Sequence, residues 1–180
     1  MDTDAGRLLA HPARRGSSPA LDSSETTSSM EYHLRAASES DKHFLYSLHC
    51  ATMRIAIEKT WGWDEAWQRN DFEKRFKEQL VSVIEFGARD VGALWLETSQ
   101  EVIYVADLQV LPELQGHGIG TAVLQGLTAE GAARGVPVEL AVLQVNPRAR
   151  RLYERLGFRV ADEGDPFVRM RHHSGAIGAL

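Results

Sequence analysis

The chain has 180 residues, enough for one domain with a single core and too few for two enzyme domains of ordinary size. A hydrophobic content of 43% and a charged content of 25% are ordinary globular values, which exclude a fully disordered or collagen-like chain. The net charge of -5 gives no overall basic field for a phosphate backbone, so we expect no nucleic-acid partner.

The first 30 residues differ in composition from the rest, because they are rich in serine and contain no aromatic residue. Such a segment cannot bury enough apolar area to offset chain entropy, so we expect a disordered leader over residues 1–30. Hydrophobic periodicity then predicts one domain over residues 31–171, followed by a flexible tail over residues 172–180.

Periodicity, capping residues and glycines together predict the elements of this domain. In chain order we expect a strand at 31–35, a helix from Ser38 to about Lys59, a helix capped by Asp64 up to about Gln79, a hairpin of 81–86 with 91–97, a strand at 102–110, a helix at 118–134, a strand at 136–145, a helix at 148–156 and a hairpin of 158–161 with 167–171. Several antiparallel strands followed by strand-helix-strand-helix indicate the α+β class with a mixed sheet.

A glycine-rich segment lies where the strand at 102–110 passes into the next helix. Gly116, Gly118 and Gly120 alternate there, so the backbone amides are uncovered at the positive end of a helix and form an anion cradle. A dinucleotide fingerprint is excluded, since Thr121 stands where its third glycine belongs. A Walker-type phosphate loop is excluded by the lack of a lysine. A glycine-rich turn without a ligand is the structural alternative.

Two motifs in this region resemble one known family. Gln115-x-x-Gly118-x-Gly120, preceded by Val110-x-Pro112, is similar to the acetyl-CoA-binding loop of the GNAT superfamily of N-acetyltransferases. The segment from Asn146 to Phe158 resembles the same family's N-x-x-A-x-x-x-Y-x-x-x-G-F pattern. The resemblance covers about residues 31–171 and implies a mixed, mostly antiparallel sheet. This sheet is splayed between its fourth and fifth strands, with helices on both faces in a three-layer arrangement.

The resemblance implies acetyl-CoA as co-substrate, with its pyrophosphate on the loop amides and its pantetheine arm in the splay. An amide at Val110 would polarise the thioester carbonyl. The implied contacts to acetyl-CoA are Leu108, Gln109, Val110, Gln115, Gly116, His117, Gly118, Ile119, Gly120, Thr121, Asn146 and Tyr153.

Tyr153 matches the family's general acid, which protonates the departing thiolate. Its alternative role is packing, because Tyr153 shares one apolar helix face with Ala149, Leu152 and Leu156. Asn146 followed by proline is also a good helix cap. Arginines at 148, 150 and 151 would reach the phosphates of acetyl-CoA or, as is more usual on an exposed helix, remain solvated.

A general base is harder to find. An amine with a pKa of about 10.4 is mostly protonated at pH 7, so exposing its lone pair costs about 4–5 kcal/mol unless a base takes the proton. The two strand positions where family members carry a glutamate are Ala141 and Tyr104 here. Asp107 is the nearest carboxylate, and a β-bulge would turn it towards the cleft; its alternative is a solvated strand residue. Glu85 and Glu97 are weaker candidates.

In this family the first two helices and their connection select the acceptor. Trp63 and Trp67 are one helical turn apart, and with Asp64 they would surround a cationic amine. Their alternative role is to clamp the helices to the sheet. The predicted acceptor contacts are Trp61, Trp63, Asp64, Trp67 and Tyr104.

The cysteine count and the hydropathy of the chain indicate its cellular compartment, and the spacing of the histidines indicates whether it binds a metal. Cys50 is the single cysteine and fits a reducing compartment, and no apolar run is long enough for a membrane span or a signal peptide. We therefore expect a cytoplasmic protein with no membrane partner, as a monomer or homodimer. The histidines lack metal-ligand spacing, so we expect no metal.

These observations predict an enzyme, an N-acetyltransferase that moves the acetyl group of acetyl-CoA to a primary amine of a small or amino-acid-like molecule. Two alternatives remain open at this point. One is a non-catalytic module that binds acyl-CoA, and the other is acetylation of protein or peptide amines.

Overall fold

The strands and helices of the domain follow the predicted order. The computed structural model describes residues 32–173, so the predicted leader and the part of the predicted tail from residue 174 lie outside the described residues. The elements are β1 (Tyr32–Ala36), η1 (Glu39–Asp41), α1 (Lys42–Trp61), α2 (Glu65–Glu78), β2 (Leu80–Phe86), β3 (Arg89–Thr98), β4 (Ile103–Val110), η2 (Pro112–Leu114), α3 (Ile119–Arg134), β5 (Val138–Leu143), α4 (Pro147–Arg155), β6 (Arg159–Glu163) and β7 (Phe167–His172).

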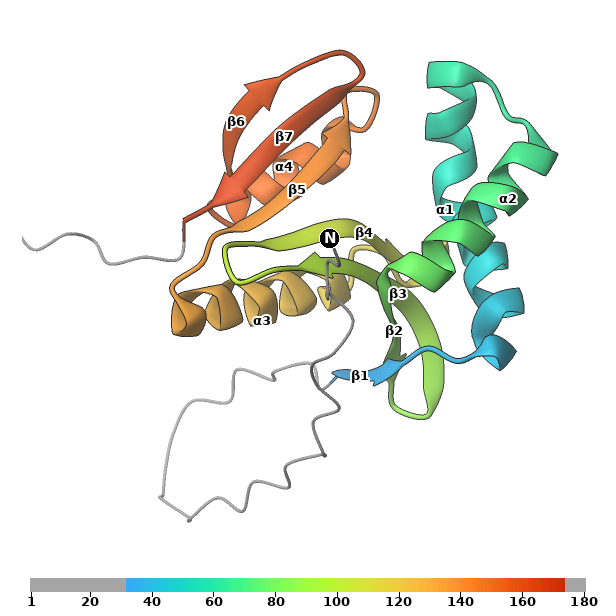
Figure 1. Cartoon of the computed structure of the whole chain (residues 1–180), viewed down its shortest axis with the longest axis horizontal. Helices are drawn as coiled ribbons and strands as arrows, with labels where there is room; N and C mark the ends of the chain where they lie inside the picture. The colour runs from blue at the N-terminus through green and yellow to red at the C-terminus, as the bar shows by residue number, and fades with distance from the viewer. Residues whose placement is uncertain (1–31, 174–180) are drawn as a thin grey trace, which may run out of the picture.

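These strands form one 7-stranded sheet in the order β1-β2-β3-β4-β5-β7-β6. Only β4 and β5 pair in parallel, and this pairing joins Ile103–Val105 to Val138–Leu140 and goes no further in the described residues. Beyond it the two strands diverge, as Figure 1 shows. The predicted splay between the fourth and fifth strands is therefore confirmed.

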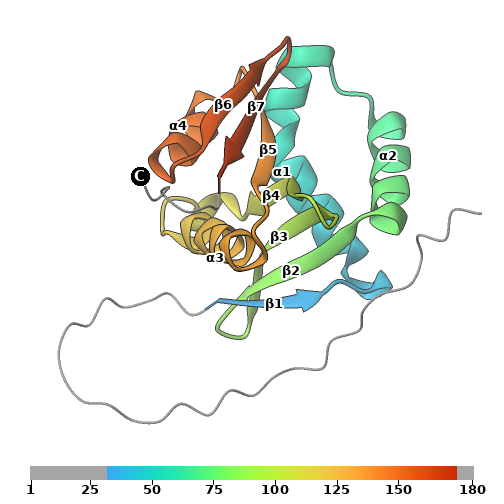
Figure 2. The ribbon, with the colours of Figure 1, turned by 60° about the vertical axis from the view of Figure 1, so that its left-hand side comes forward.

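Helices cover both faces of the sheet, with α1 and α2 on one side and α3 and α4 on the other (Figure 2). The core against α3 is the larger and is built from apolar residues that alternate along β3, β4, β5 and β7. The core against α1 and α2 is smaller and contains Leu45, Leu48, Phe72 and Trp95. The expected three-layer α+β architecture is thus confirmed.

Local chemistry explains most boundaries. Ser38 N donates to Asp41 Oδ2 at 2.7 Å as part of a capping box, but the chain first makes a turn of 3₁₀ helix, so α1 begins at Lys42, later than expected. The hairpin between β2 and β3 turns more tightly than expected. Gly87, with a φ of +61°, permits a two-residue turn, so Arg89 and Asp90 already pair with β2.

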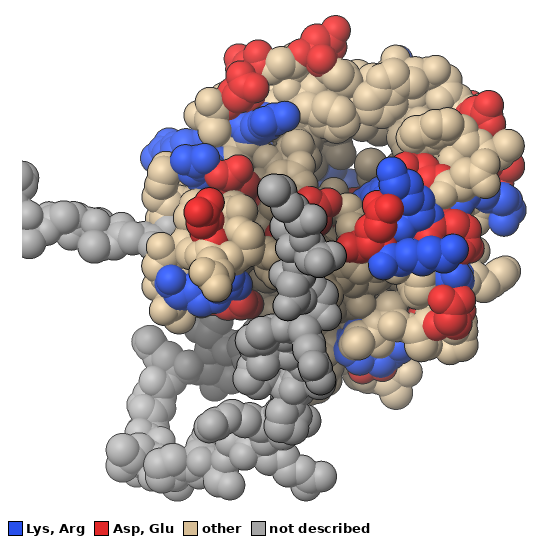
Figure 3. Space-filling model, in the orientation of Figure 1, with Lys and Arg blue, Asp and Glu red and all other residues tan. Residues whose placement is uncertain are grey.

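At the C-terminal end, β7 reaches His172, one residue further than expected, because this residue pairs with Val138 of β5. No helix within residues 32–173 is long and apolar enough to cross a membrane. On the face seen in Figure 3, acidic and basic side chains are interspersed, and the surface is hollowed between the side formed by β5 and β7 and the side formed by α1.

Candidate active site

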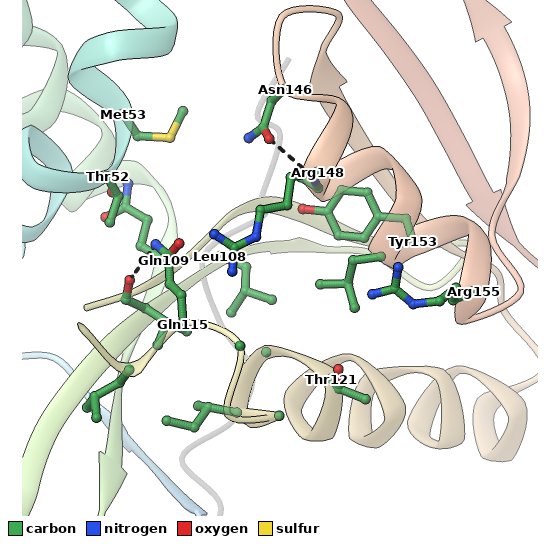
Figure 4. A pocket seen from close by; sticks show the side chains of 18 residues that line it. Thr52, Met53, Leu108, Gln109, Gln115, Thr121, Asn146, Arg148, Tyr153 and Arg155 are labelled. Carbon is green, nitrogen blue, oxygen red and sulfur yellow. Dashed lines mark hydrogen bonds between the residues drawn. The ribbon is translucent and has the colours of Figure 1, made fainter. Parts of the chain in front are cut away.

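A pocket of about 320 Å³ opens where β4 and β5 separate. Its walls come from the last residues of β4, the glycine loop, the first turn of α3 and the inner face of α4, while Thr52 and Met53 of α1 close one side (Figure 4). The lining residues are Thr52, Met53, Leu108, Gln109, Val110, Leu114, Gln115, Gly116, Gly118, Ile119, Gly120, Thr121, Asn146, Arg148, Ala149, Leu152, Tyr153 and Arg155.

The glycine loop presents backbone at this pocket because two of its residues adopt left-handed conformations. Gly116 has a φ of +86° and Gly118 a φ of +88°, which side-chain-bearing residues rarely adopt. Gly118 is the N-cap of α3 and offers no side-chain acceptor to the first amides of that helix. Gln115 Nε2 donates to the Val110 carbonyl at 3.0 Å and ties the loop to β4. Uncapped amides at a helix N-terminus attract an anion.

The predicted contacts to acetyl-CoA converge on this pocket. All of them line it except His117, whose side chain is exposed. Residues from β4, the loop and α4, separated by up to about a quarter of the chain, are thereby brought to one cavity. Their role in binding acetyl-CoA remains a prediction.

Tyr153 projects from α4 towards β4 with its hydroxyl in the pocket (Figure 4). Its ring packs against Phe158, with the ring centroids 6.0 Å apart, so the expected packing role is real. Within the described part of the chain the hydroxyl makes no hydrogen bond and is available to a ligand. Burial, together with the charge of Asp107, raises the pKa of Tyr153 to about 12, so the phenol keeps its proton at neutral pH.

Asn146 performs the capping role that its sequence context predicts. Its Oδ1 accepts a hydrogen bond from Ala149 N at 3.1 Å, and Pro147 occupies the first helical position of α4. The same side chain lines the pocket, so capping and a ligand contact are compatible.

Arg148 is a pocket residue that the sequence analysis did not distinguish from the arginines at 150 and 151. Its Nη2 lies 3.6 Å from the position that a Cβ would take at Gly116, so the guanidinium sits beside the glycine loop. Arg150 instead pairs with Glu154 at 3.0 Å and with Glu163 at 2.8 Å. Helical spacing distinguishes the two arginines. Arg148 is one turn before Leu152 and therefore borders the apolar face of α4.

Asp107 lies at a β-bulge in β4, which was one of the two alternatives considered for it. Trp95 pairs with Asp107 and Leu96 with Val105, which leaves Ala106 as the extra residue. The Asp107 side chain is 12% exposed, accepts a hydrogen bond from Gln109 Nε2 at 2.8 Å and lies 3.9 Å from Arg75. Burial raises its pKa, while the charge of Arg75 and the hydrogen bond from Gln109 oppose the rise. A carboxylate of this kind accepts a proton more readily than an exposed one.

The predicted acceptor contacts near α2 are engaged within the protein. Asp64 Oδ1 accepts from Trp67 N at 2.9 Å and caps α2. Trp63 Nε1 donates to Glu65 Oε2 at 3.0 Å, and the guanidinium of Arg54 lies 5.0 Å from the Trp63 ring. The cation that contacts the Trp63 ring in the structure is therefore Arg54 of the same protein.

The remaining predicted acceptor contacts are dispersed. Trp61 packs on Phe167, with ring centroids 5.7 Å apart, and Trp61 and Trp67 are 58% and 59% exposed. Tyr104 is half-buried on β4, and burial followed by the charge of Glu97 raises its pKa. None of the five predicted acceptor contacts lines the pocket, and their part in binding an acceptor stays a prediction.

Metal ligands do not gather at the pocket or elsewhere in the described residues. Over residues 32–173 no group of three or more histidine, cysteine, aspartate or glutamate side chains is placed to hold a metal ion.

Known proteins resemble this chain in sequence and in fold. The family model "Acetyltransferase (GNAT) family" matches residues 42–158. N-alpha-acetyltransferase 40 of Saccharomyces cerevisiae is 37% identical over 91 residues, which are 44% of this chain and 32% of the yeast protein. Thialysine N-epsilon-acetyltransferase of Mus musculus is 30% identical over 79 residues, 43% of this chain and 46% of the mouse protein. The chain thus spans less than half the length of these curated relatives.

Among solved structures, PaiA N-acetyltransferase from Thermoplasma acidophilum, in complex with coenzyme A, has a TM-score of 0.64 at 16% identity. The match covers 80% of this chain and 99% of that one. The ribosomal-protein-S18-alanine N-acetyltransferase from Escherichia coli has a TM-score of 0.61 at 19% identity, covering 82% and 97% of the two chains. At these identities the likeness shows the shared fold.

Proposed function

The chain belongs to the acetyltransferase (GNAT) family, and from this premise we propose that it transfers the acetyl group of acetyl-CoA directly to a primary amine of a small or amino-acid-like acceptor. The observation that carries the proposal is the pocket at the splay. It combines an uncapped helix N-terminus, an unpaired strand edge and a phenol without a hydrogen-bond partner in the described residues.

The first two features suit the donor. The pyrophosphate of acetyl-CoA would lie on the amides of the loop from Gln115 to Gly120, where the positive end of α3 favours an anion. Arg148 would add a cation, which the loop itself lacks. The pantetheine arm would follow the edge of β4 that β5 leaves unpaired after Val105.

The phenol and the buried carboxylate suit the transfer. Asp107 takes a proton from the acceptor ammonium, and the free amine nitrogen then attacks the thioester carbonyl. A carbon-nitrogen bond forms, the carbon-sulfur bond breaks, and Tyr153 gives its proton to the leaving thiolate. The nitrogen sheds a second proton as it becomes an amide, which restores the Tyr153 phenol, and Asp107 releases the first proton to solvent. The raised pKa of Asp107 and the protonated state of Tyr153 match these two roles. Asp107 itself is not among the residues that line the pocket, and its pairing with Tyr153 is supported by the contribution of its charge to the raised pKa of Tyr153.

A second candidate function is acetylation of a peptide amine, favoured by the 37% identity to the yeast N-alpha-acetyltransferase. The mouse relative, by its name, acts on the side-chain amine of an amino acid, which favours the small acceptor. A binding module without catalysis is the third possibility, and the phenol of Tyr153 is the feature that argues against it.

The proposal is tested by following thiol release from acetyl-CoA with separate panels of amino acids, polyamines, aminoglycosides and peptides. A small amine that releases thiol and is recovered as its N-acetyl derivative supports the proposal. Turnover confined to peptides would replace it with the second candidate. Binding of acetyl-CoA without turnover on any panel would favour the binding module.

A further inference from the structure

A series of buried polar side chains connects the two N-terminal helices to Asp107. Gln68 Oε1 on α2 is 2.9 Å from His49 Nε2 on α1. His49 Nδ1 is 3.4 Å from Gln109 Nε2 on β4, and Gln109 Nε2 is 2.8 Å from Asp107 Oδ2. The linking residues Gln68, His49 and Gln109 are only 4%, 9% and 3% exposed.

The chemistry of these groups fixes the direction of each hydrogen bond. An ionised carboxylate only accepts, so Gln109 turns its NH₂ group towards Asp107. The second hydrogen of the same NH₂ group points to His49 Nδ1, which must therefore accept. The imidazole then carries its hydrogen on Nε2 and donates it to Gln68 Oε1. One set of protonation states satisfies all three contacts.

Packing alone does not account for this series. The same interface between α1, α2 and the sheet is otherwise aromatic and aliphatic, with Tyr46, Phe72 and Trp95 in edge-to-face contact. Buried polar groups in such a setting cost stability unless each finds a partner. These residues find partners in one another, and the series ends on the carboxylate at the β-bulge.

We propose that His49, held by Gln68, is a positioning residue that acts through Gln109 to fix the Asp107 carboxylate in its charged form. The inference rests on the proposed function, in which Asp107 takes the proton of the acceptor amine. Gln109 Nε2 donates to Oδ2, the oxygen that also lies 3.9 Å from Arg75, and the Leu108 backbone is a further donor to this carboxylate.

The same arrangement predicts how the pH dependence responds when the series is broken. The groups that face Asp107 are Arg75 of α2, His49 of α1 and Tyr153 of α4, together with the donating side chain of Gln109. The bond from Gln109 lowers the pKa of Asp107. If Gln109 lost its hydrogen bond to His49, it would hold Asp107 less firmly and the pKa of Asp107 would rise. Asp107 would then stay protonated to higher pH, and the acid limb of the rate profile would shift to higher pH.

Two substitutions of one residue separate positioning from packing. His49→Phe keeps the ring and its contacts and removes the acceptor at Nδ1. His49→Asn gives up the ring and places its amide oxygen where Nδ1 was. The control is Tyr46→Phe, one turn earlier on α1, which removes only the hydroxyl that donates to Glu65.

If His49 positions Asp107, His49→Phe should lower kcat roughly tenfold with little change in Tm, since a displaced Asp107 no longer meets the reacting amine in the near-attack geometry. His49→Asn recovers most of kcat in spite of a lower Tm, and Tyr46→Phe keeps the native kcat. A packing role predicts the opposite order, with Phe tolerated and Asn impaired. That order would overturn the proposal.

A second readout requires no turnover. Titration of the Asp107 carboxyl carbon, followed by nuclear magnetic resonance, should move to higher pH in His49→Phe and return towards the native curve in His49→Asn. An unchanged titration in His49→Phe overturns the positioning role. Absence of amine-dependent thiol release from the native protein overturns the proposed function instead, and the titration then decides the positioning role by itself.

Discussion

Tyr153 is the residue on which the proposed chemistry depends most directly. Tyr153→Phe keeps the ring against Phe158 and removes a hydroxyl that has no partner in the described residues, so Tm and affinity for acetyl-CoA should barely change. We expect kcat to fall roughly 100-fold, the usual contribution of a positioned proton donor. Rates are measured at saturating acetyl-CoA with the best acceptor. Native turnover in this variant would make Tyr153 a packing residue only.

Arg148 provides a test of the donor site with a matched control on the same helix. Arg148→Ala removes the cation beside Gly116 and should raise the Kd for acetyl-CoA about tenfold, with kcat at saturation unchanged. Arg151→Ala removes a charge from an exposed position of α4 outside the pocket and should leave the Kd unaltered. Isothermal titration with acetyl-CoA measures both. Equal effects of the two substitutions would mean that Arg148 acts through general charge alone.

The pH dependence of the rate follows from the opposite protonation states that Asp107 and Tyr153 need. The base works only when ionised, and burial raises the pKa of Asp107, so kcat/KM should fall as pH drops through that raised value. The acid works only when protonated, and its pKa of about 12 means that Tyr153 imposes no alkaline limb below that pH.

Asp107→Asn should lower the rate roughly 100-fold and abolish the acid limb assigned to this carboxyl. The check is a profile of kcat/KM against pH for both proteins under one set of buffers. An acid limb that persists unchanged in the variant would place the base elsewhere.

At the scale of elements, the turn into α3 should control donor binding. Gly118 and Gly135 lie at the two ends of this helix, and both have left-handed φ values, of +88° and +69°. Valine at either position is strained and should lower Tm. Only Gly118→Val should also abolish the rise in Tm that acetyl-CoA causes in the native protein, because that loop lines the pocket. A thermal-shift assay compares them, and a preserved shift in Gly118→Val would remove the loop from the site.

Much of this element-scale architecture is predictable from the sequence. Asp64 and Asn146 cap α2 and α4 as their positions predict, because capping is a local interaction between a side chain and an amide three residues away. For Asp107 the sequence left two readings open, a residue turned inward by a β-bulge and a solvated strand residue, and the structure has the bulge and a side chain only 12% exposed. The glycine loop was predicted from its spacing, and its left-handed conformations at Gly116 and Gly118 are what that spacing requires.

What the sequence does not disclose are contacts between distant segments. The hydrogen bonds among Gln68, His49 and Gln109 join α2, α1 and β4, and each residue in isolation looks like an ordinary polar position. The same reason explains the tryptophans near α2. Their spacing in the sequence suggests one helical turn, but Trp63 precedes the N-cap Asp64 of α2, and the Arg54 side chain over Trp63 is visible only in the folded protein.

At the scale of the whole molecule, the fold and the family model both indicate the acetyltransferase (GNAT) family, while the identity of the acceptor stays a proposal. The family model spans residues 42–158 and therefore includes α1, the glycine loop and Tyr153. The curated relatives match over 79 to 91 residues and bear names that refer to different amines. The segment from Trp61 to Trp67, which holds four of the five predicted acceptor contacts, is therefore the first place for substitutions once an acceptor is found.

The central claim is that acetyl-CoA bound at the splay gives its acetyl group directly to an amine. The most direct measurement quantifies free thiol and N-acetylated amine in one reaction, alongside the intact mass of the protein. The account predicts equimolar thiol and N-acetyl product, formed only when acetyl-CoA and amine are both present, with no acetyl group left on the protein. Thiol released without an amine, or an acetylated protein in place of an acetylated amine, would contradict it.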